Sequence, residues 1–357
     1  MSWDNVTGVS TAYIWTDNPD MTQAYLFANG NHQVKVTVGV SFNLQGEGPT
    51  EDEVKAAISL LNYNTGAEIS HLKPVGQGEY LSVYLPNMPE QPKAMADSSG
   101  KAYQYEFDYY LSSDSDINSG FSSEQVAVLI SYTNADGKSE YSTASDSSRQ
   151  SYVAVAVYPP KKYGMLNSGM TPVSLEVKND NFQVTIETIS SYLNHFYEPT
   201  AKLYNLRIDD SYFRLIKFIA SNTPLIPSAF MQHIVNDNTD KTDKDAHDYT
   251  VSHSFLPQEN PVYSDYIDYQ SKLKLVNADG VDLIDYTANF EQGGGEVLFA
   301  QITQRLDYHV NSDSIGPMSN AGGQATLTAY DQFGNPVNIV VQGDGGGDGN
   351  LKLESVN

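Results

Sequence analysis

Short runs in which apolar and polar residues alternate recur along the chain and predict β-strands. In the run 33–42 every second residue is apolar, so one face of the strand carries Val34, Val36, Val38, Val40 and Phe42. The runs 125–132 and 152–158 are more continuously apolar, which is typical of strands buried on both faces. Turn-forming residues separate such runs, as at Asn29-Gly30, Asp136-Gly137, Asp279-Gly280 and Gly334-Asn335-Pro336. The pattern therefore predicts an all-β chain of β-sandwiches.

One early segment has a helical pattern instead. Thr50 followed three residues later by Glu53 is a capping-box signature. The apolar residues that follow at helical spacing are Val54, Ala57, Ile58 and Leu61. We therefore expect one short helix near 50–62 as the minor helical component of the fold.

A break near residue 160 predicts two tandem domains. The chain has 357 residues, enough for about two domains, and Pro159-Pro160 cannot continue a β-ladder. The segments beginning at Leu26 and Leu175 resemble each other, as do those beginning at Gln125 and Gln324. We expect an N-terminal β-sandwich over 1–160. A C-terminal β-sandwich over 161–357 carries a long insertion, a loop over 236–248 and a Gly/Asp-rich tail.

The stretch 325–337 resembles bacterial immunoglobulin-like domains of the invasin and intimin type. It reads Ala-Thr-Leu-Thr-Ala-Tyr-Asp-Gln-Phe-Gly-Asn-Pro-Val, with the aromatic–Asp pair, the Gly-Asn-Pro-Val turn and the flanking strand that this family shows. The resemblance implies an immunoglobulin-like fold and a structural or adhesive role in a bacterial or phage-like setting. It implies no catalytic residue, because a fold alone does not give a function.

The net charge and the amino-acid composition argue against several classes of partner and site. There are 44 acidic and 20 basic residues, a net charge of −24, which opposes nucleic acid and anionic lipid surfaces. No cysteine is present, which excludes disulfides and thiolate metal sites. We expect no stable membrane span and no signal peptide. The protein is then made in the cytoplasm and either stays there or leaves by a signal-independent route.

Catalytic and metal-binding motifs are missing from the sequence. It contains no Gly-x-Ser-x-Gly elbow, no His-Glu-x-x-His and no phosphate loop with a lysine. We therefore expect no enzymatic activity, no cofactor and no metal, with Asp344 and Asp348 of the tail as weak calcium candidates. We expect His247 and His253 to be exposed loop residues, and Asp114 to belong to a turn.

Tyrosine is the unusual component, with 25 residues against 13 Phe and 2 Trp. Large rings with a polar tip suit binding surfaces, although the same alternation also suits a strand that packs on a core. Both interpretations stay open at this stage. The binding candidates are Tyr103, Tyr105, Tyr109, Tyr110, Tyr263, Tyr266 and Tyr269.

Three classes of function fit these observations. The first is a non-enzymatic structural or interaction protein that binds other proteins or copies of itself, as a homo-oligomer, through Tyr-rich β-surfaces. The second is an effector or toxin that binds a host membrane or receptor and oligomerises into a pore. The third is a carbohydrate-binding module. The first is the main expectation, because it needs no catalytic chemistry.

Overall fold

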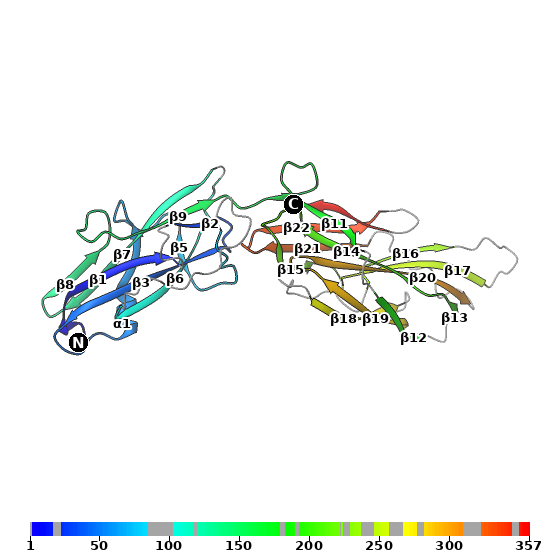
Figure 1. Cartoon of the computed structure of the whole chain (residues 1–357), viewed down its shortest axis with the longest axis horizontal. Coiled ribbons are helices and arrows are strands. Elements are labelled where there is room, and N and C mark those ends of the chain that lie inside the picture. The colour runs from blue at the N-terminus through cyan, green and yellow to red at the C-terminus, as the bar shows by residue number, and fades with distance from the viewer. Residues whose placement is uncertain are drawn as a thin grey trace. The chain divides into compact units, whose positions relative to one another are not determined.

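The computed structural model of the chain is built almost entirely of β-strands. It describes residues 2–16, 23–84, 103–117, 120–178, 183–189, 193–221, 223, 229–236, 246–256, 267–276, 282–309, 323–344 and 350–357. The structure is 63% strand and 4% helix, which confirms the all-β prediction. Two compact units make up the chain: unit 1 consists of Met1–Lys161 with Phe333–Asn335, and unit 2 of Lys162–Gln332 with Pro336–Asn357 (Figure 1).

Unit 1 is formed by two sheets around one core. Its first sheet has the strand order β1-β3-β6-β5, and its second has the order β2-β9-β7-β4 with β8 paired to β7. The largest core cluster of the unit takes residues from both sheets, such as Val36 of β3 and Val128 of β7. The elements are η1 (Ser2–Asn5), β1 (Val6–Thr16), β2 (Gln23–Phe27), β3 (Gln33–Leu44), α1 (Glu51–Ala57), β4 (Ile58–Asn62), β5 (Lys73–Val75), β6 (Tyr105–Ser112), β7 (Ser122–Asn134), β8 (Gly137–Ser142) and β9 (Val153–Tyr158).

The alternating pattern of β3 predicts its buried face correctly. Val36, Val38 and Val40 are fully buried, and Val34 and Phe42 are buried beside them. Residues between them face the other side of the sheet, because successive side chains of a strand point to opposite faces. The predicted turns at Gly30, Gly137 and Gly334 have φ of 75°, 117° and 73°, which glycine adopts without strain. Asp279 and Gly280 lie outside the described residues.

The predicted helix begins where expected but ends early. Thr50 caps α1, and both hydrogen bonds of the capping box are present: the Thr50 side chain accepts from the Glu53 N–H, and the Glu53 side chain accepts from the Thr50 N–H. The helix ends at Ala57, and Ile58 is already extended, with φ −90° and ψ 131°. Ile58 and Leu61 belong to β4, which pairs with β7 from Ile130 to Val126, so the helical prediction for 58–62 is wrong. The apolar spacing of residues 58–62 suits either a helix or a strand. Backbone hydrogen bonding to the long strand β7 decides in favour of the strand.

Unit 2 contains three sheets. The largest has the order β10-β11-β14-β20-β17-β16, with β13 also paired to β20, and the others have the orders β12-β19-β18 and β15-β21-β22-β23. The strands are β10 (Tyr163–Gly164), β11 (Thr171–Lys178), β12 (Gln183–Ile189), β13 (Leu193–Phe196), β14 (Thr200–Ile208), β15 (Leu215–Ser221), β16 (Met231–Asn236), β17 (Ala246–Phe255), β18 (Ile267–Val276), β19 (Asp282–Gln292), β20 (Val297–His309), β21 (Gln324–Asp331), β22 (Pro336–Gly343) and β23 (Leu351–Val356). Leu298 of β20 and Phe290 of β19 share a core cluster, so the first two sheets pack on each other.

Two sequence expectations for unit 2 are wrong. The expected loop over 236–248 ends earlier, because residues 246–248 already belong to β17. His253 of that strand is fully buried, not exposed, and neither of its ring nitrogens has a hydrogen-bond partner in the structure. Burial lowers its pKa to about 3, so the ring is neutral at pH 7. Periodicity gave no sign of this strand, because its first half is polar.

A buried polar contact connects the first and last parts of unit 2. The Tyr163 hydroxyl of β10 donates to the Asp331 carboxylate of β21 at 2.5 Å, and the two side chains are 2% and 0% exposed. Burial and the Asp331 charge raise the pKa of Tyr163 well above its ordinary value. Asp331 is the acidic residue of the Tyr-Asp-Gln-Phe-Gly-Asn-Pro stretch, so that stretch has a structural role here.

We expect Tyr163→Phe to destabilise unit 2 by about 2 kcal/mol, because it leaves a buried carboxylate without one of its donors. Calorimetric unfolding of the whole chain measures the loss. Tyr152→Phe, at a half-buried tyrosine of unit 1, is the matched control. An unchanged transition of unit 2 in Tyr163→Phe would show that the contact contributes nothing.

Candidate binding surface

The structure divides the first tyrosine cluster between two faces of β6. Tyr105 and Tyr109 are partly buried and pack against the core of unit 1, so the core interpretation fits these two side chains. The Tyr105 hydroxyl donates to the Pro49 carbonyl at 2.7 Å, and burial raises the pKa of Tyr109 to about 12. Tyr103 and Tyr110 lie away from this core, and both are partly exposed.

The second tyrosine cluster is described only in part. Tyr263 and Tyr266 lie outside the described residues. Tyr269 lies in β18, where it is opposite Phe290 of β19. The candidate surface therefore comes from the first cluster.

The outer face of the first sheet of unit 1 has a regular arrangement across three strands. One row joins Tyr13 of β1 to Gly39 of β3 and Glu106 of β6, and the next joins Trp15 to Thr37 and Asp108. Residues directly opposite each other in antiparallel strands point to the same face. The face therefore combines aromatic rings on β1 with polar and acidic side chains on β6. We call it the aromatic face: Tyr13, Trp15, Lys35, Thr37, Gly39, Tyr103, Glu106, Asp108 and Tyr110.

Three rings of the aromatic face lie in nearly parallel planes. The centroids of Tyr13 and Trp15 are 6.2 Å apart with an interplanar angle of 29°, and those of Trp15 and Tyr103 are 5.5 Å apart at 23°. Tyr13 is 40% exposed, whereas Trp15 and Tyr103 are partly exposed. The other tryptophan, Trp3, packs against the core and stacks on Tyr132. Trp15 is thus the tryptophan of the aromatic face.

Glycine at position 39 makes this arrangement of rings fit. A Cβ atom on Gly39 would lie 2.6 Å from the Tyr103 ring and 2.9 Å from Cη2 of Trp15, closer than real Cβ contacts. Both rings therefore lie directly over the backbone of β3. A glycine inside a strand often marks such a close approach.

Two carboxylates and one lysine, Glu106, Asp108 and Lys35, belong to the aromatic face with the rings. Asp108 accepts a hydrogen bond from the Thr37 hydroxyl at 2.7 Å and lies 3.5 Å from the Lys35 ammonium group. Glu106 makes no hydrogen bond or ion pair with another described residue. Burial, followed by Tyr13 and the Glu106 charge, raises the pKa of Tyr103, so these groups interact electrostatically. The Glu106 carboxylate is thus an acceptor beside the rings that no other described residue occupies.

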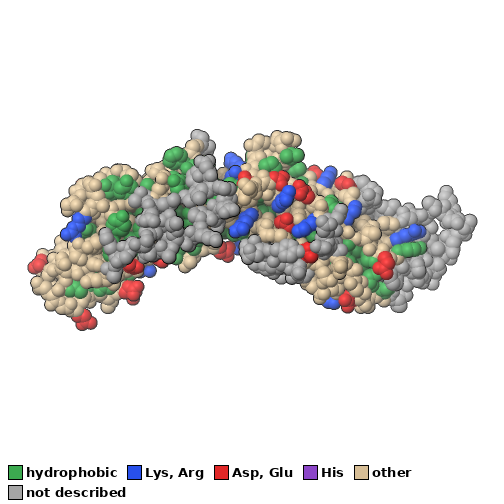
Figure 2. Space-filling model, in the orientation of Figure 1, with side chains coloured by type: hydrophobic (Ala, Val, Ile, Leu, Met, Phe, Trp, Pro, Cys, Tyr) green, Lys and Arg blue, Asp and Glu red, His purple; other side chains and the backbone are tan. Residues whose placement is uncertain are grey.

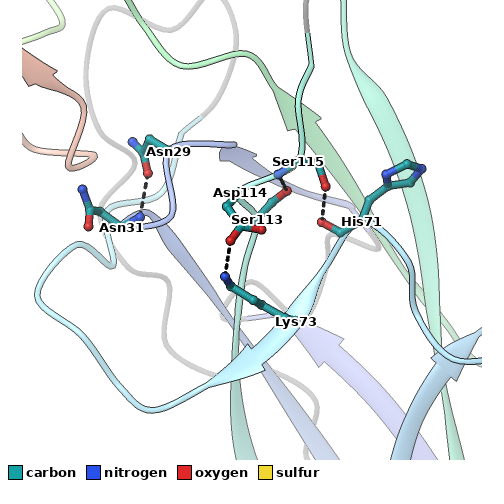
Figure 3. Close-up of polar contacts among 7 residues, drawn as sticks. All are labelled: Asn29, Asn31, His71, Lys73, Ser113, Asp114 and Ser115. Atoms are coloured by element: carbon teal, nitrogen blue, oxygen red, sulfur yellow. Dashed lines mark hydrogen bonds and ion pairs between the residues drawn. The ribbon is translucent and has the colours of Figure 1, made fainter.

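Another polar group of unit 1 is structural. Asp114 pairs with Lys73 at 2.5 Å, and the Ser115 hydroxyl donates to the His71 carbonyl (Figure 3). The hydrogen bond and charge of Lys73 lower the pKa of Asp114. These contacts, with the Asn29 side chain that accepts from the Asn31 N–H, hold neighbouring turns together. The turn interpretation of Asp114 fits this geometry.

Metal ligands and membrane helices are not found in the described part of the chain. No group of three or more His, Asp or Glu residues there is placed to hold a metal ion. Asp344 is exposed and its N–H bonds the Asn350 carbonyl, whereas Asp348 lies outside the described residues. No helix of the described residues is long and apolar enough to cross a membrane.

Several charged side chains of unit 2 lie beside opposite charges. Figure 2 shows basic and acidic side chains close together over its described surface. Examples are Arg207 with Glu176 at 3.0 Å and Lys178 with Glu296 at 3.5 Å. Such exposed pairs contribute little stability, and they place charges of both signs side by side on this part of the surface. The more distinctive surface belongs to unit 1.

Side chains cap the backbone of β1, the edge strand of the first sheet. Arg149 donates to the carbonyls of Val9 and Ser10, and the Ser151 hydroxyl accepts from the Ile14 N–H at 3.2 Å. Asn134 donates to the Val6 carbonyl at 3.3 Å. Edge strands with free backbone groups invite pairing with another chain, and capped groups resist it.

Comparison with known proteins identifies no relative. No protein-family model matches the chain, and no curated protein matches its sequence significantly. The alternation Ala12-Tyr13-Ile14-Trp15 contains a signal for two of the rings, because it places both on the same face of a strand. Its pairing with Tyr103 depends on a contact that sequence spacing does not give.

Proposed function

We propose that the protein is a non-enzymatic binding protein that uses the aromatic face of unit 1 for recognition. The observation that carries this proposal is the set of three nearly parallel rings that Gly39 admits onto the outer face of the sheet. Partly exposed aromatic residues beside polar groups are typical of recognition surfaces. Binding costs entropy when flexible side chains become ordered. Rings that already contact each other in the free protein lose less of this entropy.

The same geometry favours recognition by a face over assembly by strand edges. Strand addition needs free backbone groups along an edge, and Arg149, Ser151 and Asn134 occupy several of those on β1. At this edge of the first sheet, the expected homo-oligomerisation would then have to use side-chain surfaces. An immunoglobulin-like adhesive role agrees with this proposal, because adhesion also depends on binding without chemistry.

Photo-crosslinking tests the proposal without assuming a partner. A benzoylphenylalanine replaces Tyr13, and the protein is irradiated in an extract of its source culture. The matched control carries the same group in place of Phe121, which is 59% exposed on unit 1 but is not part of the aromatic face. We expect adducts at position 13 that excess wild-type protein suppresses and excess Trp15→Ala does not. Equal labelling at both positions, or equal competition by Trp15→Ala, would contradict the proposal.

Removing the caps of β1 should increase self-association. We expect the double variant Arg149→Ala, Ser151→Ala to form more dimer than the wild type at the same concentration, because β1 then presents free backbone groups. Sedimentation velocity over a concentration series measures this. Lys138→Ala, at an exposed position of β8, is the control for loss of a positive charge. An unchanged sedimentation coefficient in the double variant would mean that the caps do not protect this edge.

A further inference from the structure

We propose that the ligand of the aromatic face is a neutral glycan, with a sugar ring stacked on the Tyr13–Trp15–Tyr103 cluster and sugar hydroxyls donating to Glu106. This inference rests on the proposed function and adds the chemical class of the ligand. Three observations support it: the positions of the rings, the pairing of the charges around them and the net charge of the chain.

Ring geometry gives the first argument. A sugar ring has a face of C–H bonds, which packs on an aromatic ring, and a rim of hydroxyl groups, which needs hydrogen-bond partners. The planes of neighbouring rings deviate by only 29° and 23°, so the rings stack on one another. The sugar ring packs on the outward side of this stack, where Tyr13 is 40% exposed. A cage for a methylated ammonium group instead needs rings at steep angles around one point. Parallel rings therefore favour the flat face of a sugar.

The charge arrangement gives the second argument. Lys35 and Asp108 neutralise each other, and Thr37 occupies an oxygen of Asp108. Glu106 remains as an exposed acceptor directly across β3 from Tyr13, with Gly39 between them. A carboxylate accepts hydrogen bonds from neutral hydroxyls without requiring a positive partner. The face thus offers stacking and one strong acceptor, which together match a polyol.

Net charge disfavours the main competing occupants. A second copy of this chain also carries a charge of −24, and phosphorylated or sulfated ligands are anionic. Both would bring like charge against Glu106 and an acidic chain. A neutral glycan meets no such repulsion. A basic protein partner remains the competing possibility, and the salt dependence of binding separates it from a neutral sugar.

Affinity electrophoresis of the full chain tests the inference. The acidic protein migrates in native, mildly alkaline gels, and the probes cast into them are hydroxyethylcellulose, xylan, galactomannan and laminarin. We expect retardation in at least one gel, with an affinity that added salt leaves unchanged. A matching oligosaccharide should also change tryptophan emission in a Trp3→Phe variant, whose remaining tryptophan is Trp15.

Three variants assign the binding to the aromatic face. We expect Trp15→Ala to weaken binding about tenfold, the loss that one stacked ring contributes. Gly39→Val should weaken it as well, although all three rings stay in the chain, because the new side chain displaces Tyr103 and Trp15. Phe121→Ala is the control that loses an exposed ring elsewhere and keeps binding. Circular dichroism and urea midpoints show that each variant is folded.

Several results would overturn the inference. They are no retardation by any of the four polysaccharides, retardation that is equal in wild type, Trp15→Ala and Gly39→Val, or binding that salt abolishes. If crosslinking at position 13 captures a protein in a Trp15-dependent way while no glycan binds, the inference fails and the proposed function stands. If neither assay depends on Trp15, both fail.

Discussion

Replacing Glu124 with Gln is expected to destabilise unit 1 by about 3 kcal/mol, because two backbone donors and one amide lose a buried carboxylate. Glu124 is 2% exposed, and its two oxygens accept the N–H groups of Ser70 and His71, each at 2.9 Å. Asn62 donates a third hydrogen bond at 3.1 Å. Burial raises the pKa of Glu124, but these hydrogen bonds together outweigh it and lower the pKa. Gln has nearly the same shape, yet its NH₂ group would face a backbone donor.

Urea unfolding followed by tryptophan emission measures this effect in unit 1 alone, because Trp3 and Trp15, the two tryptophans of the chain, both lie there. The matched control is Glu140→Gln on β8, where the carboxylate is half exposed and pairs with Lys138. We expect that change to stay within about 0.5 kcal/mol. Equal midpoints for the two variants would remove Glu124 from the interactions that stabilise the unit.

Mild acid is expected to weaken both units through one buried histidine each. Burial lowers the pKa of His32 to about 4 and that of His253 to about 3. At pH 7 both rings are neutral in the folded chain and mostly neutral in the unfolded chain, where the pKa of histidine is about 6.5. Below pH 6.5 the unfolded chain binds protons that the folded rings do not, so stability falls by about 1.4 kcal/mol per pH unit for each ring. At pH 5 each unit should lose about 2 kcal/mol.

The two histidines differ in their contacts, which allows separate tests. The Nδ1 atom of His32 accepts from the Phe27 N–H at 3.0 Å, and its Nε2–H donates to the Ser82 carbonyl, so protonation of Nδ1 breaks the first bond. His253 has no such bonds, so His253→Phe should remove the acid sensitivity of unit 2 without a large loss at pH 7. Unfolding of unit 2 by calorimetry between pH 5 and pH 7 measures the slope. His71→Gln, at an exposed site, is the control, and an unchanged slope in His253→Phe would refute the assignment.

Sequence patterns correctly predicted those features that depend only on residues close together in the chain. The buried face of β3 follows from strict alternation, and the start of α1 follows from the Thr50–Glu53 capping box. The end of α1 was not predictable in this way. Residues 58–62 become a strand because β7 offers them a backbone partner, although β7 begins only at Ser122, far along the sequence.

Sequence patterns predicted only some residues of the candidate surface, and there is a physical reason why the others were not predicted. Tyr103 and Tyr110 were singled out, but Tyr105 and Tyr109 on the same strand pack inward. Alternation separates two faces of a strand without stating which of them is covered by the second sheet. Tyr13 and Trp15 were not predicted, because they lie far in sequence from the tyrosine-rich runs 103–110 and 263–269. Only the pairing of three strands brings these rings to Tyr103.

The pairing of β2 with β9 has a consequence for how unit 1 is made. Gln23 to Phe27 pair in parallel with Ala154 to Tyr158, the final strand of the unit, and β2 has no other partner in its sheet. As the chain leaves the ribosome, β2 emerges early and has to wait until residue 158 has been synthesised. Contacts between such distant residues form slowly, and unpaired strands are prone to aggregate meanwhile. Nascent chains stalled before residue 158 should therefore depend on chaperones far more than chains that include it.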